Sequence, residues 1–267
     1  MRVLIAVDME GISGVTHWDH VKPGHTEYTR FREIMTEEVN AAIDGALDGG
    51  ATSIVVTDGH SDGRNILIEK LHAPAHLNSG SPAPLSMVEG ASDVDRVFFI
   101  GYHARAGTPA AILCHTWTDQ VRQVWLNQQE MGEIGLNAAV CGSFGAPVVM
   151  ITGDQAAVQE ATDLLGSIEA VVVKTASGRM SAECYPIEEV HTAIRHTAAH
   201  AMVRQAQPYL VAAPITLRVE LARPDQIDRA LRVPGSQRVD GVTIEWIGND
   251  MVDVYHAFRA IVGLGGS

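Results

Sequence analysis

The sequence has little of what would associate it with nucleic acids, membranes or disulfide frameworks. Its 267 residues carry 19 Lys and Arg against 32 Asp and Glu, a formal charge of −13. Nucleic acids and anionic membranes bind basic patches, so this charge argues against both as partners. No apolar run approaches the ~20 residues of a membrane span. The three cysteines, Cys114, Cys141 and Cys184, form no CxxC spacing. They fit a reducing compartment better than a disulfide framework or a zinc knuckle.

Several familiar catalytic motifs are also missing. No Ser or Cys lies in a GxSxG elbow, which disfavours a Ser/His/Asp hydrolase, and the absence of a GxxxxGK[ST] motif disfavours nucleotide binding. The pairs His72/His76 and His196/His200 have the i,i+4 spacing of a helical zinc site but lack the glutamate of HExxH. The chain enters a predicted strand at once, without a charged n-region or a signal-like apolar segment, so we expect a cytoplasmic protein.

The apolar pattern predicts an α/β fold. A strand over Val3–Val7, a helix over about Glu27–Leu47 and a strand over Ala51–Thr57 form a βαβ unit, which implies a parallel sheet. Further strands are expected at 97–101, 147–153 and 170–174, and further helices at 132–143, 154–165 and 187–206. We therefore expect a three-layer α/β/α fold with a largely parallel sheet.

The pattern of apolar residues changes near residue 214. Strand-like alternation at 215–221 and 239–247 is separated by a helical stretch at 224–231 and followed by another at 251–261. We therefore expect two domains, a metal-binding catalytic α/β domain over 1–210 and a small C-terminal β-α-β-α module over 211–267.

Polar side chains that suit a metal follow the predicted strands. Asp8 and Glu10 follow the first, His60 the second and His103 the third, while Glu133 begins a predicted helix. The carboxyl ends of parallel strands meet at one sheet edge, where ligands of open α/β sheets bind. Carboxylates mixed with imidazoles suit Zn²⁺, Mn²⁺ or Fe²⁺. The alternative is that each residue caps a helix or satisfies a loop.

These five residues exceed the three protein ligands of a mononuclear catalytic zinc. They suit two metals roughly 3.5–4 Å apart that share a water or hydroxide, with Asp8 as the bridge. His115 follows the apolar stretch Ile112–Cys114 and could move protons or bind an oxyanion beside such a site, or simply be a hydrogen-bonded loop or core histidine. Lys174 and Arg179 flank a Gly/Ser-containing loop that could hold a substrate carboxylate.

With these residues in view, the chain resembles the zinc-dependent D-aminopeptidases of the DppA type. The matching segments are VDMEGISGV at the N-terminus, TDGH around His60, GYHA around His103, CHTW around His115 and NQQEMGEIGLNA around Glu133. VKTASGRMSAECYP resembles a later strand and loop of the family. The resemblance covers nearly the whole chain and weakens after about residue 210. Ala6 departs from the serine of the family's opening motif.

The resemblance implies a metal-dependent aminopeptidase for short peptides, with D-alanine-type N-termini as the expected substrates. It implies two zinc ions per subunit, with Asp8 bridging, Glu10 and His60 on one ion, and His103 and Glu133 on the other. His115 is similar to the family's proposed catalytic histidine, and the family's assembly is a homodecamer. The alternatives are another binuclear amidohydrolase or L-peptidase at the same site, or a non-catalytic dipeptide-binding module associated with transport.

Overall fold

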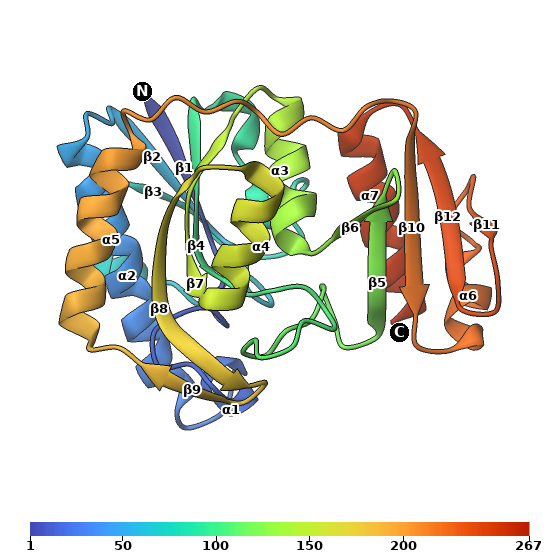
Figure 1. Ribbon diagram of the computed structural model, residues 1–267, viewed down its shortest axis with the longest axis horizontal. Helices are drawn as coiled ribbons and strands as arrows, with labels where there is room; N and C mark the ends of the chain where they lie inside the picture. The colour runs from blue at the N-terminus through green and yellow to red at the C-terminus, as the bar shows by residue number, and fades with distance from the viewer. Residues whose placement is uncertain (267) are drawn as a thin grey trace.

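A seven-stranded, largely parallel sheet forms the centre of the computed structural model, which describes residues 1–266 (Figure 1). Its strands lie in the order β3 (His76–Asn78), β2 (Ser53–Asp58), β1 (Arg2–Val7), β4 (Arg96–Tyr102), β7 (Val148–Asp154), β8 (Glu169–Gly178) and β9 (Ser181–Cys184). All neighbouring pairs are parallel except β8 and β9. The expected parallel sheet is confirmed, with β1 and β2 side by side as the βαβ prediction requires.

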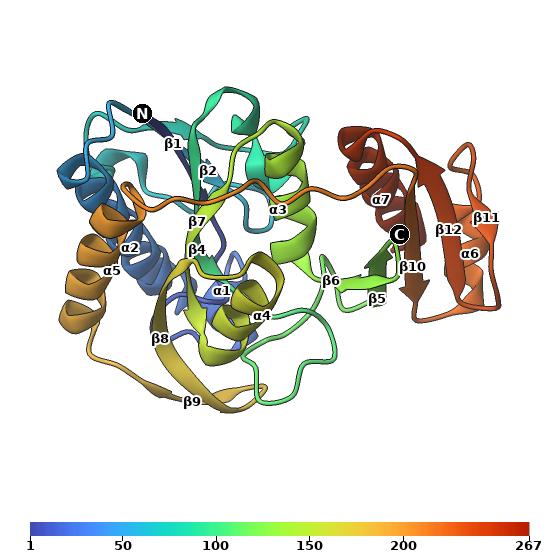
Figure 2. The ribbon, with the colours of Figure 1, turned by 45° about the horizontal axis from the view of Figure 1, so that its top comes forward.

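Helices cover both faces of this sheet. The helices α2 (Tyr28–Asp48) and α5 (Ile187–Ala201) pack together on one face, and α3 (Glu133–Ser143) and α4 (Gln155–Leu165) lie on the other (Figures 1 and 2). Side chains along a strand alternate between faces. Accordingly Val3, Ile5 and Val7 join one core, while Leu4 and Ala6 join the other. The three-layer α/β/α prediction is confirmed.

One predicted loop is instead strand. The stretch 175–179, expected as a Gly/Ser loop after a strand ending at Lys174, continues β8 to Gly178 and turns into β9. The reason is pairing: Thr175 and Ala176 find antiparallel partners in Glu183 and Ala182. The helix expected over 187–206 ends at Ala201.

A second, antiparallel sheet of five strands lies beside the first (Figure 1). Its strands lie in the order β11 (Gln237–Arg238), β12 (Thr243–Gly248), β10 (Ile215–Leu221), β5 (Val121–Leu126) and β6 (Gln129–Met131). The helices α6 (Pro224–Ala230) and α7 (Met251–Gly265) belong to the same part of the chain as β10–β12. The β-α-β-α order of the tail is therefore present, but β5 and β6 from the middle of the chain complete its sheet.

The two sheets share a hydrophobic core. Leu4 of β1, Leu136 of α3 and Phe258 of α7 belong to one continuous buried cluster. The expected domain boundary at residue 210 stays a prediction. The sheet of the C-terminal part also contains β5 and β6, from residues 121–131. No helix within residues 1–266 is both long and apolar enough to cross a membrane. A short helix, α1 (Trp18–Val21), lies in the loop between β1 and α2.

Candidate metal centre

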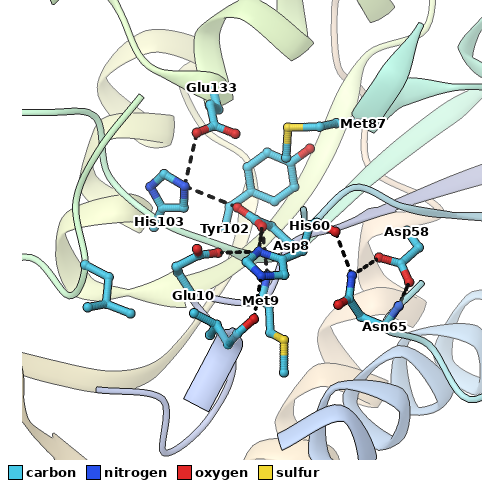
Figure 3. A network of polar contacts seen from close by, with 12 residues as sticks. Asp8, Met9, Glu10, Asp58, His60, Asn65, Met87, Tyr102, His103 and Glu133 are labelled. Atoms are coloured by element: carbon cyan, nitrogen blue, oxygen red, sulfur yellow. Dashed lines mark hydrogen bonds and ion pairs between the residues drawn. The ribbon is translucent and has the colours of Figure 1, made fainter. Parts of the chain in front are cut away.

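Three adjacent strands bring the predicted site residues together. The strand β1 lies between β2 and β4, so the segments that follow these three strands emerge side by side. Asp8 and Glu10 follow β1, His60 follows β2 and His103 follows β4. Glu133 is the first residue of α3, where a carboxylate is favoured by the helix dipole. Figure 3 shows all five side chains converging on one point.

Asp8 lies at the centre of this cluster. Its Oδ1 is 3.4 Å from Nδ1 of His60, and its Oδ2 is 3.3 Å from Nε2 of His103. The same nitrogen of His60 is 3.1 Å from Oε2 of Glu10, and that of His103 is 3.3 Å from Oε1 of Glu133. The carboxylate of Asp8 therefore faces two histidines at once, one with each oxygen, as a bridging ligand would.

Both histidines are oriented by backbone carbonyls. Nε2 of His60 lies 2.9 Å from the carbonyl oxygen of Val21, and Nδ1 of His103 lies 3.0 Å from that of Ala104. A carbonyl oxygen only accepts, so these nitrogens donate, and the opposite nitrogen of each ring faces the carboxylates. Metal-binding histidines are typically held in this way by their outer nitrogen.

The cluster buries three carboxylates and leaves several of its polar atoms without a hydrogen-bond partner. Asp8, Glu10 and Glu133 are 2%, 2% and 5% exposed, and the Oδ2 of Asp8, Oε2 of Glu10 and Nε2 of His103 are buried without a hydrogen-bond partner. Burial disfavours charge on the imidazoles, yet the facing carboxylates outweigh it and hold the pKa of His60 and His103 well above its usual value. Unpartnered carboxylate oxygens and an imidazole nitrogen are the donors that zinc accepts, so the residues fit this metal.

Two groupings of donors lie within reach of single ions. One ligand atom from each of Asp8, Glu10 and His103 lies within 4.8 Å of the others, and the same holds for His103, His115 and Glu133. His115 is therefore near enough to His103 and Glu133 to be a metal ligand as well as a catalytic residue. Its Nε2 is 3.8 Å from Oε1 of Glu133, and its ring stacks on that of His103 with centroids 4.1 Å apart.

A glycine and a lysine hold the segment that carries Glu10. The Gly11 amide donates to the carbonyl oxygen of Gly101 at 2.8 Å, and a Cβ at Gly11 would lie 2.0 Å from the carbonyl oxygen of Tyr102. Lys174 is fully buried, and its Nζ donates to the carbonyl oxygens of Glu10 and Ile12, each at 2.7 Å. The suggestion that Lys174 binds a substrate carboxylate is therefore wrong, because backbone carbonyls occupy its ammonium.

Arg179 has a similar bracing function. Its Nη2 donates to the Oδ1 of Asp119 at 2.7 Å and to the carbonyl oxygen of Cys114 at 3.1 Å, and its guanidinium lies over the ring of Trp18. These contacts connect the turn between β8 and β9 to the segment around His115. The guanidinium is paired with the carboxylate of Asp119 and not with a free position in the cavity.

Asp58, the strand-end acid beside His60, points away from the cluster. Its carboxylate accepts from the side-chain amide of Asn65 at 2.7 Å and from the backbone amide of Ile66 at 2.8 Å. The same amide nitrogen of Asn65 donates to the carbonyl oxygen of His60 at 2.7 Å (Figure 3). Asp58 thus shapes the loop that presents His60. The paired histidines His196 and His200 contact each other on α5, away from the cluster.

The cluster lies in the wall of a cavity of about 940 Å³, a volume typical of small-ligand pockets. Trp18, Trp117 and Met87 supply apolar surface to the cavity, and Lys22, His256 and Arg259 supply its further basic side chains. Sequence reasoning missed His256 and Arg259 because nothing in the spacing of the tail indicates that α7 borders the site. Trp117 lies two residues beyond His115, and its backbone amide donates to Oε1 of Glu133 at 2.7 Å.

Comparisons with known proteins agree with this geometry. The family model described as D-aminopeptidase, peptidase family M55, matches residues 1–260. A curated D-aminopeptidase of Bacillus subtilis (strain 168) is 36% identical over 268 residues, covering 99% of this chain and 97% of that protein. The solved structure of the Zn-dependent D-aminopeptidase DppA from Bacillus subtilis, described as a self-compartmentalizing protease, superposes with a TM-score of 0.97 at 35% identity. That match covers 100% of this chain and 98% of the other.

Proposed function

The chain belongs to the D-aminopeptidase family, and from this premise we propose that it is a zinc-dependent hydrolase that removes D-amino acids from the N-termini of short peptides. One observation in the structure carries the proposal. The carboxylate of Asp8 faces His60 with one oxygen and His103 with the other, inside a cavity large enough for a peptide. A site with this donor set suits catalysis, because structural zinc sites are usually closed and often contain cysteine.

We further propose two zinc ions per chain. Asp8 would bridge them, Glu10 and His60 would complete one site, and His103 and Glu133 would complete the other. The nitrogen–oxygen distances support this division, since His60 lies 3.1 Å from Glu10 and His103 lies 3.3 Å from Glu133. When bound, zinc polarises the scissile carbonyl and lowers the pKa of water toward ~7, supplying hydroxide at neutral pH.

His115 is the proposed catalytic residue outside the ligand set. Its Nδ1 donates to the carbonyl oxygen of Leu113 at 2.9 Å, which fixes the ring and leaves Nε2 facing Glu133 and the cavity. From this position Nε2 can, once protonated, donate to the oxyanion of the tetrahedral intermediate or to the leaving amine. Trp18 packs edge-on against the same ring with centroids 5.4 Å apart and limits its rotation.

Oligomeric state and location complete the proposal. The similar Bacillus subtilis structure is described as a self-compartmentalizing protease, so we propose that this chain also assembles with copies of itself, as a homodecamer. Cys114, Cys141 and Cys184 are all free thiols, which supports a reducing, cytoplasmic environment. Light scattering of the purified protein tests the stoichiometry directly.

The function is tested by hydrolysis of D-Ala-D-Ala and L-Ala-L-Ala, each before and after chelation. Release of D-alanine that chelation abolishes and zinc restores is the expected result. Cleavage of the L-peptide alone would keep the metal chemistry but discard the D-preference. Turnover of neither peptide by the zinc-loaded protein would contradict the proposal and favour another amide substrate.

The two-metal arrangement is tested by elemental analysis of matched glutamate variants. Wild-type protein should hold two zinc ions per chain, and Glu10→Gln and Glu133→Gln should each hold one. Glu38→Gln is the control, because Glu38 is as buried as the proposed ligands but accepts from the Ser13 amide at 2.8 Å instead of facing the cluster. One zinc in the wild type, or two in both glutamate variants, would overturn the assignment.

A further inference from the structure

The helix α7 supplies part of the wall of the cavity that the candidate metal ligands also line. His256, Arg259 and Ala260 line it, together with Ser81 and Ser86 from the loop that follows β3. This helix packs on the second sheet. The cavity is therefore lined both by residues at the strand ends of the first sheet and by residues of α7. The candidate metal ligands lie at the strand ends of the first sheet, and Arg259 belongs to the opposite part of the cavity lining, on α7.

Arg259 is held rigidly but lacks a countercharge. Its Nη1 donates to the carbonyl oxygens of Ala83 at 2.9 Å and Pro84 at 2.8 Å, and its guanidinium lies over the ring of Tyr255. Within residues 1–266, no carboxylate oxygen lies within 4.0 Å of its nitrogens. The neutral carbonyls orient the guanidinium without cancelling its charge, so it remains available to an anion in the cavity.

The other basic side chains near the cavity are less suited to binding an anion. Lys174 is buried against two carbonyl oxygens, and Arg179 is already paired with Asp119. Lys22 lines the cavity, but it is exposed, and a flexible lysine loses more side-chain freedom on binding than a braced guanidinium. Arginine also matches the planar geometry of a carboxylate, which it can bind through two parallel hydrogen bonds.

We propose that Arg259 binds the C-terminal carboxylate of the peptide substrate. The inference rests on the proposed aminopeptidase function and specifies its substrate class. A short peptide places its amine among the carboxylates and metal ions at one wall and its own carboxylate toward the guanidinium at the other. Asp8 and Arg259 line the same cavity of about 940 Å³, and an extended residue spans about 3.5 Å, so the proposal concerns peptides of a few residues. The enzyme would then select short peptides with a free C-terminus.

The test compares D-Ala-D-Ala with its C-terminal amide, using the initial rate of D-alanine release by zinc-loaded enzyme. A charged hydrogen-bonded pair predicts that the wild type favours the free acid by about ten- to hundredfold in kcat/KM. Arg259→Met should lose most of this preference, mainly through a higher KM for the acid, because the contact does not change in the chemical step. The amide should change by less than about threefold, and Arg259→Lys should recover part of the preference.

Two control variants separate carboxylate binding from a bracing role. His256 contacts the carbonyl oxygen of Pro84 at 3.1 Å, so His256→Leu weakens the same contact between helix and loop while keeping the guanidinium. It should affect acid and amide equally. Lys22→Met should keep the preference for the acid. An equal loss for both substrates in Arg259→Met, or a lost preference in Lys22→Met, would overturn the proposal.

The wild-type rates alone distinguish failure of the carboxylate subsite from failure of the aminopeptidase function. If it cleaves acid and amide equally well, the carboxylate subsite is wrong and the aminopeptidase function stands. If it cleaves neither substrate, the proposed function itself fails.

Discussion

Lys174 donates from Nζ to the backbone carbonyl oxygen of Glu10 at 2.7 Å, although 164 residues separate the two in the chain. Lys174 belongs to β8, and Glu10 follows β1, with the two strands β4 and β7 between them in the sheet. Burial lowers the pKa of Lys174 to about 8, against the opposing effect of Asp154 and Glu38. A buried ammonium thus fixes the backbone that carries a proposed metal ligand.

Replacing this lysine should weaken the metal site as well as the fold. Lys174→Met keeps the aliphatic length but leaves the carbonyl oxygens of Glu10 and Ile12 without their donor, which should cost about 2–4 kcal/mol in the free energy of unfolding. Zinc affinity, measured by competition with a chelator, should fall at least about tenfold for one ion. Lys70→Met is the control, since Lys70 pairs with Glu33 at the surface and should leave zinc affinity intact. Unchanged zinc affinity in Lys174→Met would show that Glu10 is held in place without it.

Removal of His115 should separate catalysis from metal binding. His115→Ala should keep two zinc ions per chain and lose at least about a hundredfold in kcat, because the proposed role of Nε2 is to donate to the reacting group. Elemental analysis and steady-state kinetics on the same sample measure both quantities. The experiment distinguishes a catalytic from a ligand role, because His115 lies within one of the two groups of donors that could hold an ion. Parallel loss of zinc and activity would place His115 among the ligands.

The candidate site was predictable because its residues follow local rules. Buried parallel strands read as continuous apolar runs, and the polar residue that ends each run lies at the ligand-binding edge of the sheet. This rule places Asp8, His60 and His103 together at one edge of the sheet. Asp58 also ends a strand, and the contacts of Asn65 with Asp58 and His60 show that its carboxylate turns away from the cluster.

Long-range pairing accounts for what sequence patterns did not predict. The strands β5 and β6 are short and join a sheet whose other members lie about 90 residues later in the chain. The tail therefore looked like a separate module although its core is continuous with that of the first sheet. Arg259 was overlooked for the same reason: helical spacing predicts α7, but only the packing of α7 places that side chain in the cavity wall.

Chelation should destabilise the protein more strongly as the pH rises. Without metal, burial opposes the charged imidazoles, but the carboxylates hold the pKa of His60 and His103 well above 6.5. The folded protein then keeps protons that the unfolded chain releases near pH 6.5, so its stability is lost as the pH rises through the folded-state pKa. Zinc requires both rings unprotonated, so its stabilisation grows over the same range.

The corresponding measurement is Tm by differential scanning fluorimetry, with and without zinc, between about pH 6 and about pH 8.5. The gap between the two Tm values should widen as the pH rises. Asp8 does not disturb this range, because the two histidines outweigh burial and hold its pKa well below the usual value. A gap that is constant or that narrows would contradict the assignment of these imidazoles as metal ligands.

Glu38 should make the protein less stable toward neutral pH. Its side chain is fully buried in α2, and burial raises its pKa from 4.5 to about 7, although the Ser13 amide and Lys174 favour the charged form. The folded state therefore holds a proton that the unfolded chain releases near pH 4.5. Stability from this group is complete below that pH and is lost as the pH rises to about 7, by about 3 kcal/mol in all.

Glu38→Gln removes this ionisation and keeps a side-chain oxygen that can accept from the Ser13 amide. The free energy of unfolding of the variant minus that of the wild type, from urea titrations, should therefore increase between about pH 4.5 and about pH 7 and then level off. Taking this difference cancels proton release from the metal ligands, which both proteins share. Glu37→Gln, which makes the same substitution at an exposed position of the same helix, is the matched control. A flat difference for Glu38→Gln would show that the buried carboxylate ionises as readily in the folded protein as in the unfolded chain.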